Sequence, residues 1–151
     1  RSGGCLGLPG LPGTAEQHTN AYIKVMDNPK VCVLGHTESA DYPYDYDAVT
    51  KACKEKNVAM EFNVSRFRSQ TSIQRLHDII LPTCAKNGCY VIVDSDAHFC
   101  DKIGAFKKAE ALLKDIDFPE ELIVNADLER FESFLRLRGI KTNSEIEPDE
   151  D

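Results

Sequence analysis

Residues 89–98 read Cys-Tyr-Val-Ile-Val-Asp-Ser-Asp-Ala-His, a short apolar run that ends in two acids and a histidine. A run of this length and composition is typical of a β-strand that is buried on both faces. Similar runs precede it at residues 31–36 and 58–63. The runs start about 30 residues apart, which is the size of a βαβ unit. The sequence therefore predicts an α/β fold with parallel strands.

Amphipathic segments alternate with the apolar runs and predict the helices that connect parallel strands. Asp45 or Asp47 should cap a helix that ends near Asn57, because an aspartate accepts hydrogen bonds from the free N–H groups of a first turn. Pro82 should kink the next helix, since proline has no N–H to donate, and Gly88 should end it. The expected helices span residues 16–28, 45–57, 72–87, 103–116 and 127–139.

The last third of the chain predicts less regular structure. Ile103 and Leu128 are expected on the inward faces of the last two helices, and residues 123–124 would add a stub of a fourth strand. Three or four β-α units are too few for a closed eight-fold barrel of about 250 residues. The chain is therefore expected to be either a small open sheet or part of a barrel whose other strands cover its edges.

Length, composition and charge restrict the class of protein. The chain has 151 residues, 42% of them hydrophobic, and a net charge of −7, but its last seven residues carry five acids and no base. Nonspecific nucleic-acid binding is not expected, because phosphate neutralisation needs clustered Lys and Arg. No apolar run is long enough to cross a membrane. Residues 1–15 are expected to form a flexible Gly/Pro-rich leader, residues 16–140 the domain, and residues 141–151 a disordered acidic tail.

Six cysteines, with no C-x-x-C pair, lie partly in the strand-like and helix-like runs. Scattered thiols of this kind favour a reduced, cytoplasmic protein over a disulfide framework.

Ligand-type side chains end all three predicted strands. The first strand ends in His36, the second in Glu61 and Asn63, and the third in Asp96 and His98. Parallel strands bring their carboxyl ends to one edge of the sheet, where α/β proteins place their chemistry. Asp96 and His98 have the i, i+2 spacing that puts two side chains on the same side of an extended segment. Imidazole and carboxylate suit Zn²⁺, Mn²⁺ or Fe²⁺, so this edge is a candidate metal site.

Arg66 and Arg68 follow the second strand closely. A guanidinium group suits phosphate, so both are candidate substrate-binding residues, with a solvated loop as the alternative.

Four motifs together give the chain a resemblance to a known family. They are G-H-T-E-S at residues 35–39, M-E-F-N-V-S-R-F at 60–67, D-S-D-A-H-F at 94–99 and D-F-P-x-E-x-I-x-N at 117–125. In order and spacing they resemble the C-terminal half of PHP-domain (polymerase and histidinol phosphatase) phosphoesterases, over about residues 18–140. The first motif differs from the family's usual His-Pro by having Thr37 after the histidine.

The resemblance implies the C-terminal part of a distorted (β/α)7 TIM-like barrel with up to three divalent metal ions. It assigns His36, Asp96 and His98 as metal ligands, with Asp96 also a possible catalytic proton acceptor. Glu61 and Asn63 would line the substrate site. The family's N-terminal half, which carries further histidine ligands, has no counterpart here, so that half is expected elsewhere in the same gene or in another chain.

The implied function is hydrolysis of a small phosphorylated substrate by a metal-activated water. Two alternatives stay open. One is a non-catalytic, truncated PHP module that binds or supports a partner. The other is an unrelated open α/β domain in which His36 and Asp96 are only polar strand ends.

Overall fold

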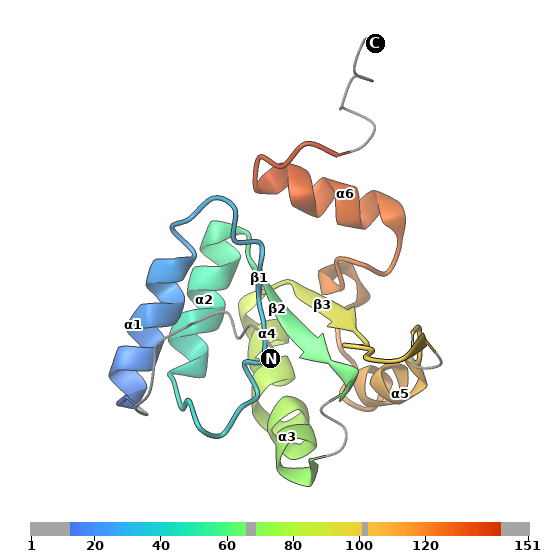
Figure 1. Cartoon of the computed structure of the whole chain (residues 1–151), viewed down its shortest axis with the longest axis horizontal. Coiled ribbons are helices and arrows are strands. Elements are labelled where there is room, and N and C mark those ends of the chain that lie inside the picture. The colour runs from blue at the N-terminus through green and yellow to red at the C-terminus, as the bar shows by residue number, and fades with distance from the viewer. Residues whose placement is uncertain (1–12, 66–68, 101–102, 143–151) are drawn as a thin grey trace.

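A three-stranded parallel sheet lies at the centre of the computed structural model (Figure 1), which describes residues 13–65, 69–100 and 103–142. Strands β1 (Val33–Leu34), β2 (Ala59–Asn63) and β3 (Val91–Asp94) follow one another in the order β1-β2-β3. Leu34 pairs with Met60, and Met60 pairs with Val91. This register brings the carboxyl ends of β2 and β3 level, and the predicted parallel α/β fold is confirmed.

Several expectations fall on residues outside the described ranges. These are most of the predicted leader, most of the predicted acidic tail, and both Arg66 and Arg68. Within the part of the chain that the structure describes, no helix combines the length and the apolar character needed to cross a membrane.

Helices α1 (Ala15–Val25) and α2 (Tyr46–Lys56) lie side by side next to the sheet (Figure 1). Of the two predicted caps for α2, the structure uses Asp45, whose side chain accepts the backbone N–H of Ala48 at 3.0 Å. Asn57 adopts the left-handed conformation with φ 54° and ends α2 as predicted. Asparagine tolerates this conformation better than most residues do, which suits it to a helix end.

The single helix expected over residues 72–87 is divided into three segments. Helix α3 (Gln70–Arg75) passes through a π-helical turn (Leu76–Ile80) into α4 (Leu81–Asn87). In the π-helical turn the N–H of Leu81 donates to the carbonyl of Leu76, one residue further back than in an α-helix. Pro82 follows directly. The irregularity predicted at the proline is therefore present, and it takes the form of a widened turn before it.

The prediction that Ile103 and Leu128 face the core is wrong. Helix α5 (Lys107–Asp115) begins four residues later than expected, and Ile103 is 73% exposed. Gly104, with φ 76°, is left-handed, which prevents a helix from starting before it. Helix α6 (Leu128–Leu137) has the predicted cap Asp127, but Leu128 occupies its first position and is 72% exposed.

The two faces of the sheet differ in character. One face, with Met60 and Phe62 of β2, packs in the main core against α2, α4 and α5. The opposite face begins with Ala59, which packs against Phe134 of α6. Further along that opposite face, strand alternation places Glu61, Asn63 and Asp94. The carboxyl end of this second face is therefore polar, and this is where the predicted site residues lie.

The predicted fourth strand is reduced to a single bridge continued by a side chain. Ile123 forms an isolated parallel bridge with Val91, and the N–H of Val124 donates to the carbonyl of Val91 at 2.9 Å. The side-chain amide of Asn125 then forms the hydrogen bonds to β3 that the backbone of a fourth strand would form. Its Oδ1 accepts the N–H of Val93 at 3.0 Å, and its Nδ2 donates to the carbonyl of Val93 at 2.6 Å. Asn125 thus satisfies the edge of β3 just before the candidate site.

Candidate metal centre at the carboxyl edge of the sheet

Two residues with an unusual backbone conformation begin the loops at this edge. His36, after β1, has φ 55°, and Asp96, after β3, has φ 41°. Non-glycine residues rarely occupy the left-handed region, and such outliers gather at functional sites. Both are strand-end residues that the sequence predicts as ligands, and both lie where the chain leaves the sheet.

His36, Glu38 and Glu61 form the first group of ligand-type atoms. Nδ1 of His36 lies 3.8 Å from Oε1 of Glu38 and 3.8 Å from Oε2 of Glu61. One ligand atom from each residue can be chosen so that all lie within 4.8 Å of one another. Glu38 is buried, with 1% of its surface exposed. An imidazole with two carboxylates at this separation is a donor set for a divalent transition metal.

The backbone holds Glu61 in this group. Oε2 of Glu61 accepts the backbone N–H of His36 at 2.6 Å. A Cβ on Gly35 would lie 3.4 Å from the same oxygen, an ordinary van der Waals contact, so the carboxylate lies directly beside the backbone of Gly35. The hydrogen bond from the turn at His36 therefore holds a β2 carboxylate against the end of β1.

Asp96 is the centre of a second group. Its Oδ2 accepts hydrogen bonds from Nδ2 of Asn63 at 3.2 Å and from Oγ of Ser65 at 3.1 Å. The Asn63 bond is the largest cause of a lowered pKa for Asp96, helped by Ser65 and by the charges of His98 and His36. Asp96 is therefore ionised at neutral pH and is held in position by the two β2-side residues.

Asp94 connects the two groups. Its Oδ1 accepts the backbone N–H of Asp96 at 3.1 Å. Burial raises the pKa of Asp94 to about 7, and so does its hydrogen bond with Glu61. Two carboxyl groups that share one proton in this way form a negatively charged site that attracts cations.

His98 is exposed and presents one nitrogen for ligation. Its Nδ1 lies 2.8 Å from the carbonyl oxygen of Asp96. A carbonyl only accepts, so Nδ1 carries a proton, which leaves Nε2 as the ring nitrogen that could bind a metal. Metal-bound histidines commonly have this arrangement, with the second nitrogen donating to a carbonyl.

The structure thus gathers His36, Glu61, Asn63, Asp96 and His98 at one edge, as the strand ends predicted. It does not place Asp96 or His98 within the compact group around His36. Their roles as ligands stay predictions.

Sequence reasoning missed Glu38, Ser65 and Asp94. Glu38 stands two residues after His36, the same spacing as Asp96 and His98, and this pattern was a usable signal. Nothing in the sequence marks Ser65, because its contact with Asp96 joins residues 31 positions apart and is accompanied by a bond from the Ser65 N–H to Oδ1 of Asn63.

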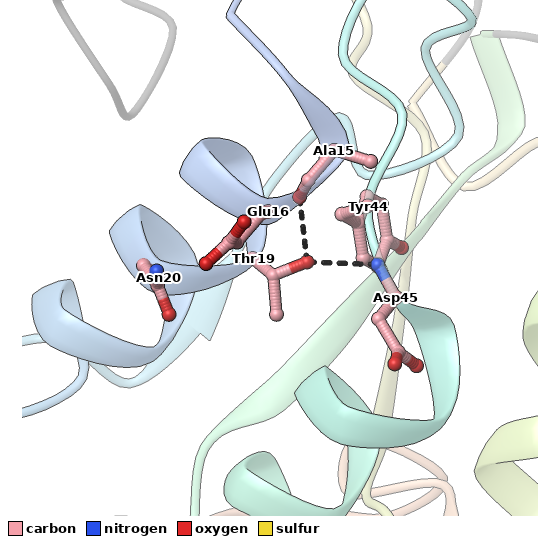
Figure 2. Close-up of a pocket in the computed structure, with 6 residues that line it drawn as sticks. All are labelled: Ala15, Glu16, Thr19, Asn20, Tyr44 and Asp45. Atoms are coloured by element: carbon pink, nitrogen blue, oxygen red, sulfur yellow. Dashed lines mark hydrogen bonds between the residues drawn. The ribbon is translucent and has the colours of Figure 1, made fainter.

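A separate hollow of about 360 Å³ lies between α1 and the start of α2. In Figure 2 the Thr19 hydroxyl donates to the carbonyl of Ala15 and accepts the N–H of Asp45, both at 2.8 Å. These bonds join α1 to the cap of α2. The lining residues are Ala15, Glu16, Thr19, Asn20, Tyr44 and Asp45, and none of them is a predicted site residue.

No protein-family model matches the chain, but it is similar to several curated bacterial proteins. It is 39% identical over 130 residues to a probable phosphatase of Clostridium novyi. The aligned region covers 85% of this chain and 53% of the relative. It is 40% identical over 128 residues to a probable phosphatase of Caldicellulosiruptor saccharolyticus, with 85% of this chain and 54% of the relative covered. A probable phosphatase of Aliivibrio fischeri is 41% identical over 125 residues, which is 81% of this chain and 50% of the relative. The chain spans about half the length of the curated relatives it matches, and the proteins it resembles are named as phosphatases.

Proposed function

We propose that this chain is part of a metal-dependent phosphoesterase of the PHP type, which hydrolyses small phosphomonoesters. The observation that carries the proposal is the gathering of His36, Glu38 and Glu61 within 4.8 Å at the carboxyl edge of a parallel sheet. The ionised Asp96 and the exposed His98 stand beside this group. Similarity to probable phosphatases supports a phosphate ester as the substrate class.

The donor set fits Zn²⁺, Mn²⁺ or Fe²⁺. His36, Glu38 and Glu61 would hold one ion, and Asp96 with His98 would contribute to a second. When bound, such ions supply Lewis acidity toward phosphate oxygens and lower the pKa of a water toward neutrality. The complete site would take up to three ions, as the family resemblance implies. Its remaining ligands would come from the part of the relatives' length that this chain does not cover, in the same gene or in another chain.

Residues of this chain hold the Asp96 carboxylate in position and keep it ionised. Asn63 and Ser65 fix the Asp96 carboxylate, and its lowered pKa keeps it ionised at neutral pH. Asp96 is the proposed catalytic residue. Glu61 and Asn63 line the substrate side, and Arg66 and Arg68 are proposed to bind the phosphate.

We also propose that the sheet is part of a distorted (β/α)7 barrel. Helices pack on the face of Met60 and Phe62, as on the outside of a barrel. The opposite face is polar at its carboxyl end, as the mouth of a barrel would be. This geometry would direct Glu61, Asn63 and Asp94 toward the barrel interior.

Hydrolysis of p-nitrophenyl phosphate tests the function. We would assay this chain, and a longer protein that includes the segment covered only in the relatives, with and without Mn²⁺. Asp96→Asn should lower metal-dependent activity about 100-fold or more, because an amide replaces the carboxylate that would serve as a ligand. The matched control is His77→Gln, at an exposed histidine that bonds Asp78 and Asp115 instead of the site.

Equal activity in the Asp96→Asn variant and the wild type, or activity that does not respond to Mn²⁺ or a chelator, would refute the proposal. Metal binding without hydrolysis, in both the chain and the longer protein, would favour the non-catalytic module instead.

A further inference from the structure

The loop between β1 and α2 carries two of the three residues of the compact group, His36 and Glu38. It opens with a turn over residues 36–39, which the N–H of Ser39 closes by donating to the carbonyl of His36 at 3.3 Å. We call residues 36–39 the ligand turn. His36 holds its first position and Glu38 its third, so the conformation of the turn sets the distance of 3.8 Å between the imidazole and the buried carboxylate.

A side chain from another β-α unit holds the ligand turn in place. Nη1 of Arg75, the last residue of α3, donates to the carbonyl of Ser39 at 3.1 Å, across 36 positions of the sequence. Arg75 is half-buried. Figure 1 shows α3 at the end of the sheet to which the β2 arrow points, which is the end where the candidate metal centre lies. The bond therefore joins α3 to the residue that directly follows Glu38.

The irregular helix between β2 and β3 directs Arg75 toward this loop. The π-helical turn begins directly after Arg75 and contains one residue more than an α-helical turn, which rotates α3 by about 100° relative to α4. Helix α3 has no buried residue, whereas the π-helical turn and α4 bury Leu76, Ile80, Leu81 and Cys84. The extra residue thus lets α4 pack in the core while the end of α3 contacts the ligand turn, and π-helical turns often occur at functional sites.

Arg75 bonds a backbone carbonyl and not a carboxylate of the site. Within residues 13–65, 69–100 and 103–142, the structure gives Arg75 the bond to Ser39 and no ion pair. The guanidinium therefore does not pair with a proposed metal ligand. Its positive charge alone would disfavour a cation bound nearby. Any benefit of Arg75 to metal binding must come from the position of the ligand turn.

We propose that Arg75 is a positioning residue of the candidate metal centre, which holds the ligand turn so that His36 and Glu38 stay at the separation that one divalent cation needs. The proposal rests on the proposed function for the presence of the metal. Groups that orient metal ligands through hydrogen bonds contribute about 10- to 100-fold to metal affinity. Arg75 acts through the backbone of Ser39 and is itself not a ligand.

Titration of the 151-residue chain with Mn²⁺, with the free ion measured by electron paramagnetic resonance, tests this role. Mn²⁺ favours oxygen donors over the thiols of the chain. Arg75→Ala should raise the Kd for Mn²⁺ about tenfold or more, because the ligand turn loses its bond to α3. Arg75→Lys keeps a donor and the positive charge, and it should recover part of the affinity. All Kd values are measured at a temperature at which circular dichroism shows each variant to be folded.

Arg130→Ala is the matched control. Nη1 of Arg130 donates to the carbonyl of Glu120 at 2.9 Å, outside the candidate site. Both alanine variants lose one bond from an arginine to a carbonyl and one positive charge, so an effect of general stability or of net charge should be similar in the two. Arg130→Ala should bind Mn²⁺ like the wild type. If Arg75→Ala does not fold, Arg75→Gln, which keeps part of the side chain, is judged by the same criterion.

The same Kd in the wild type and in Arg75→Ala would overturn the proposal. Tighter binding by Arg75→Ala would also overturn it, because that sign shows an effect of charge alone. A loss of equal size in Arg130→Ala would show that the effect is not specific to the ligand turn, with the same consequence. A wild-type chain that binds no Mn²⁺ would refute the metal centre together with this role, whereas binding that Arg75→Ala retains in full would refute the role of Arg75 only.

Discussion

We predict that the side chain of Asn125 stabilises the edge of β3 that leads into the candidate site. Its amide forms two hydrogen bonds to Val93 of β3, of 3.0 and 2.6 Å, next to the start of the acidic loop. Asn125→Ala removes both partners of Val93. Each hydrogen bond contributes a net stabilisation of about 1 kcal/mol, and less where the side chain is exposed, as that of Asn125 is. The free energy of unfolding should therefore fall by about 1–2 kcal/mol.

Urea unfolding followed by circular dichroism would measure this loss. With a slope of about 2 kcal/mol per molar urea, the midpoint should fall by about 0.5–1 M. Asn20→Ala is the control, because Asn20 is an exposed asparagine on α1, and its effect should stay within about 0.5 kcal/mol.

Amide hydrogen exchange adds a residue-specific readout for the same variant. Protection of the Val93 N–H should drop, because Asn125 is its acceptor, whereas protection of the Met60 N–H should remain, because it donates to the carbonyl of Tyr90. If Asn125→Ala left both the urea midpoint and the Val93 protection at wild-type values, the claim that this amide completes the sheet edge would be refuted.

Three further predictions concern charge and backbone conformation. Burial and Glu61 raise the pKa of Asp94 to about 7, which makes ionisation of Asp94 unfavourable in the folded state. Asp94→Asn should therefore raise the free energy of unfolding by about 1–2 kcal/mol at pH 8 in the presence of chelator and change it little at pH 4. Equal effects at the two pH values would contradict this. The bonds of His77, first to Asp78 and then to Asp115, raise its pKa, so the stability they add is fully present below about pH 6.5 and is lost as pH rises through the raised value. His77→Gln should therefore lower the urea midpoint at pH 5.5 and leave it almost unchanged at pH 9, and a loss of the same size at both would argue against the ion pairs. Gly88→Ala should cost about 1 kcal/mol in the same assay, because φ 65° strains any residue with a Cβ; an unchanged midpoint would show that the turn relaxes.

Local sequence signals predicted those parts of the fold that depend on short-range chemistry. Asp45 and Asp127 cap their helices as expected, because an N-cap needs only a side chain and the next two or three N–H groups. The apolar runs also predicted the parallel strands, although β1 is only two residues long. The predictions failed where tertiary packing decides. Leu128 matches the apolar pattern of α6 but stands at its first position and points to solvent.

The candidate site was predictable in its location and only partly in its membership. Strand ends in a parallel sheet must meet, so the neighbourhood of His36, Glu61 and Asp96 followed from the sequence. The approach of Glu38 depends on the left-handed turn at His36, and a single histidine in the sequence does not mark such a turn, although histidine is enriched in this conformation. Asp94 is the last residue of β3, and its place in the site depends on the register that sets it opposite Asn63 of β2. Their contribution became apparent only from distances and from the proton shared between Asp94 and Glu61.

The metal content of the purified chain would show whether this edge of the sheet is a metal centre. We would load the purified 151-residue chain with Mn²⁺ or Zn²⁺, remove the excess, and measure bound metal by elemental analysis, with His36→Ala and His77→Gln in parallel. We predict at least about one equivalent in the wild type and in His77→Gln, and a loss of most of it in His36→Ala, because His36 supplies the imidazole of the compact three-residue group. Less than about 0.2 equivalents in the wild type, or the same metal content in His36→Ala, would contradict the claim that this sheet edge is a metal centre.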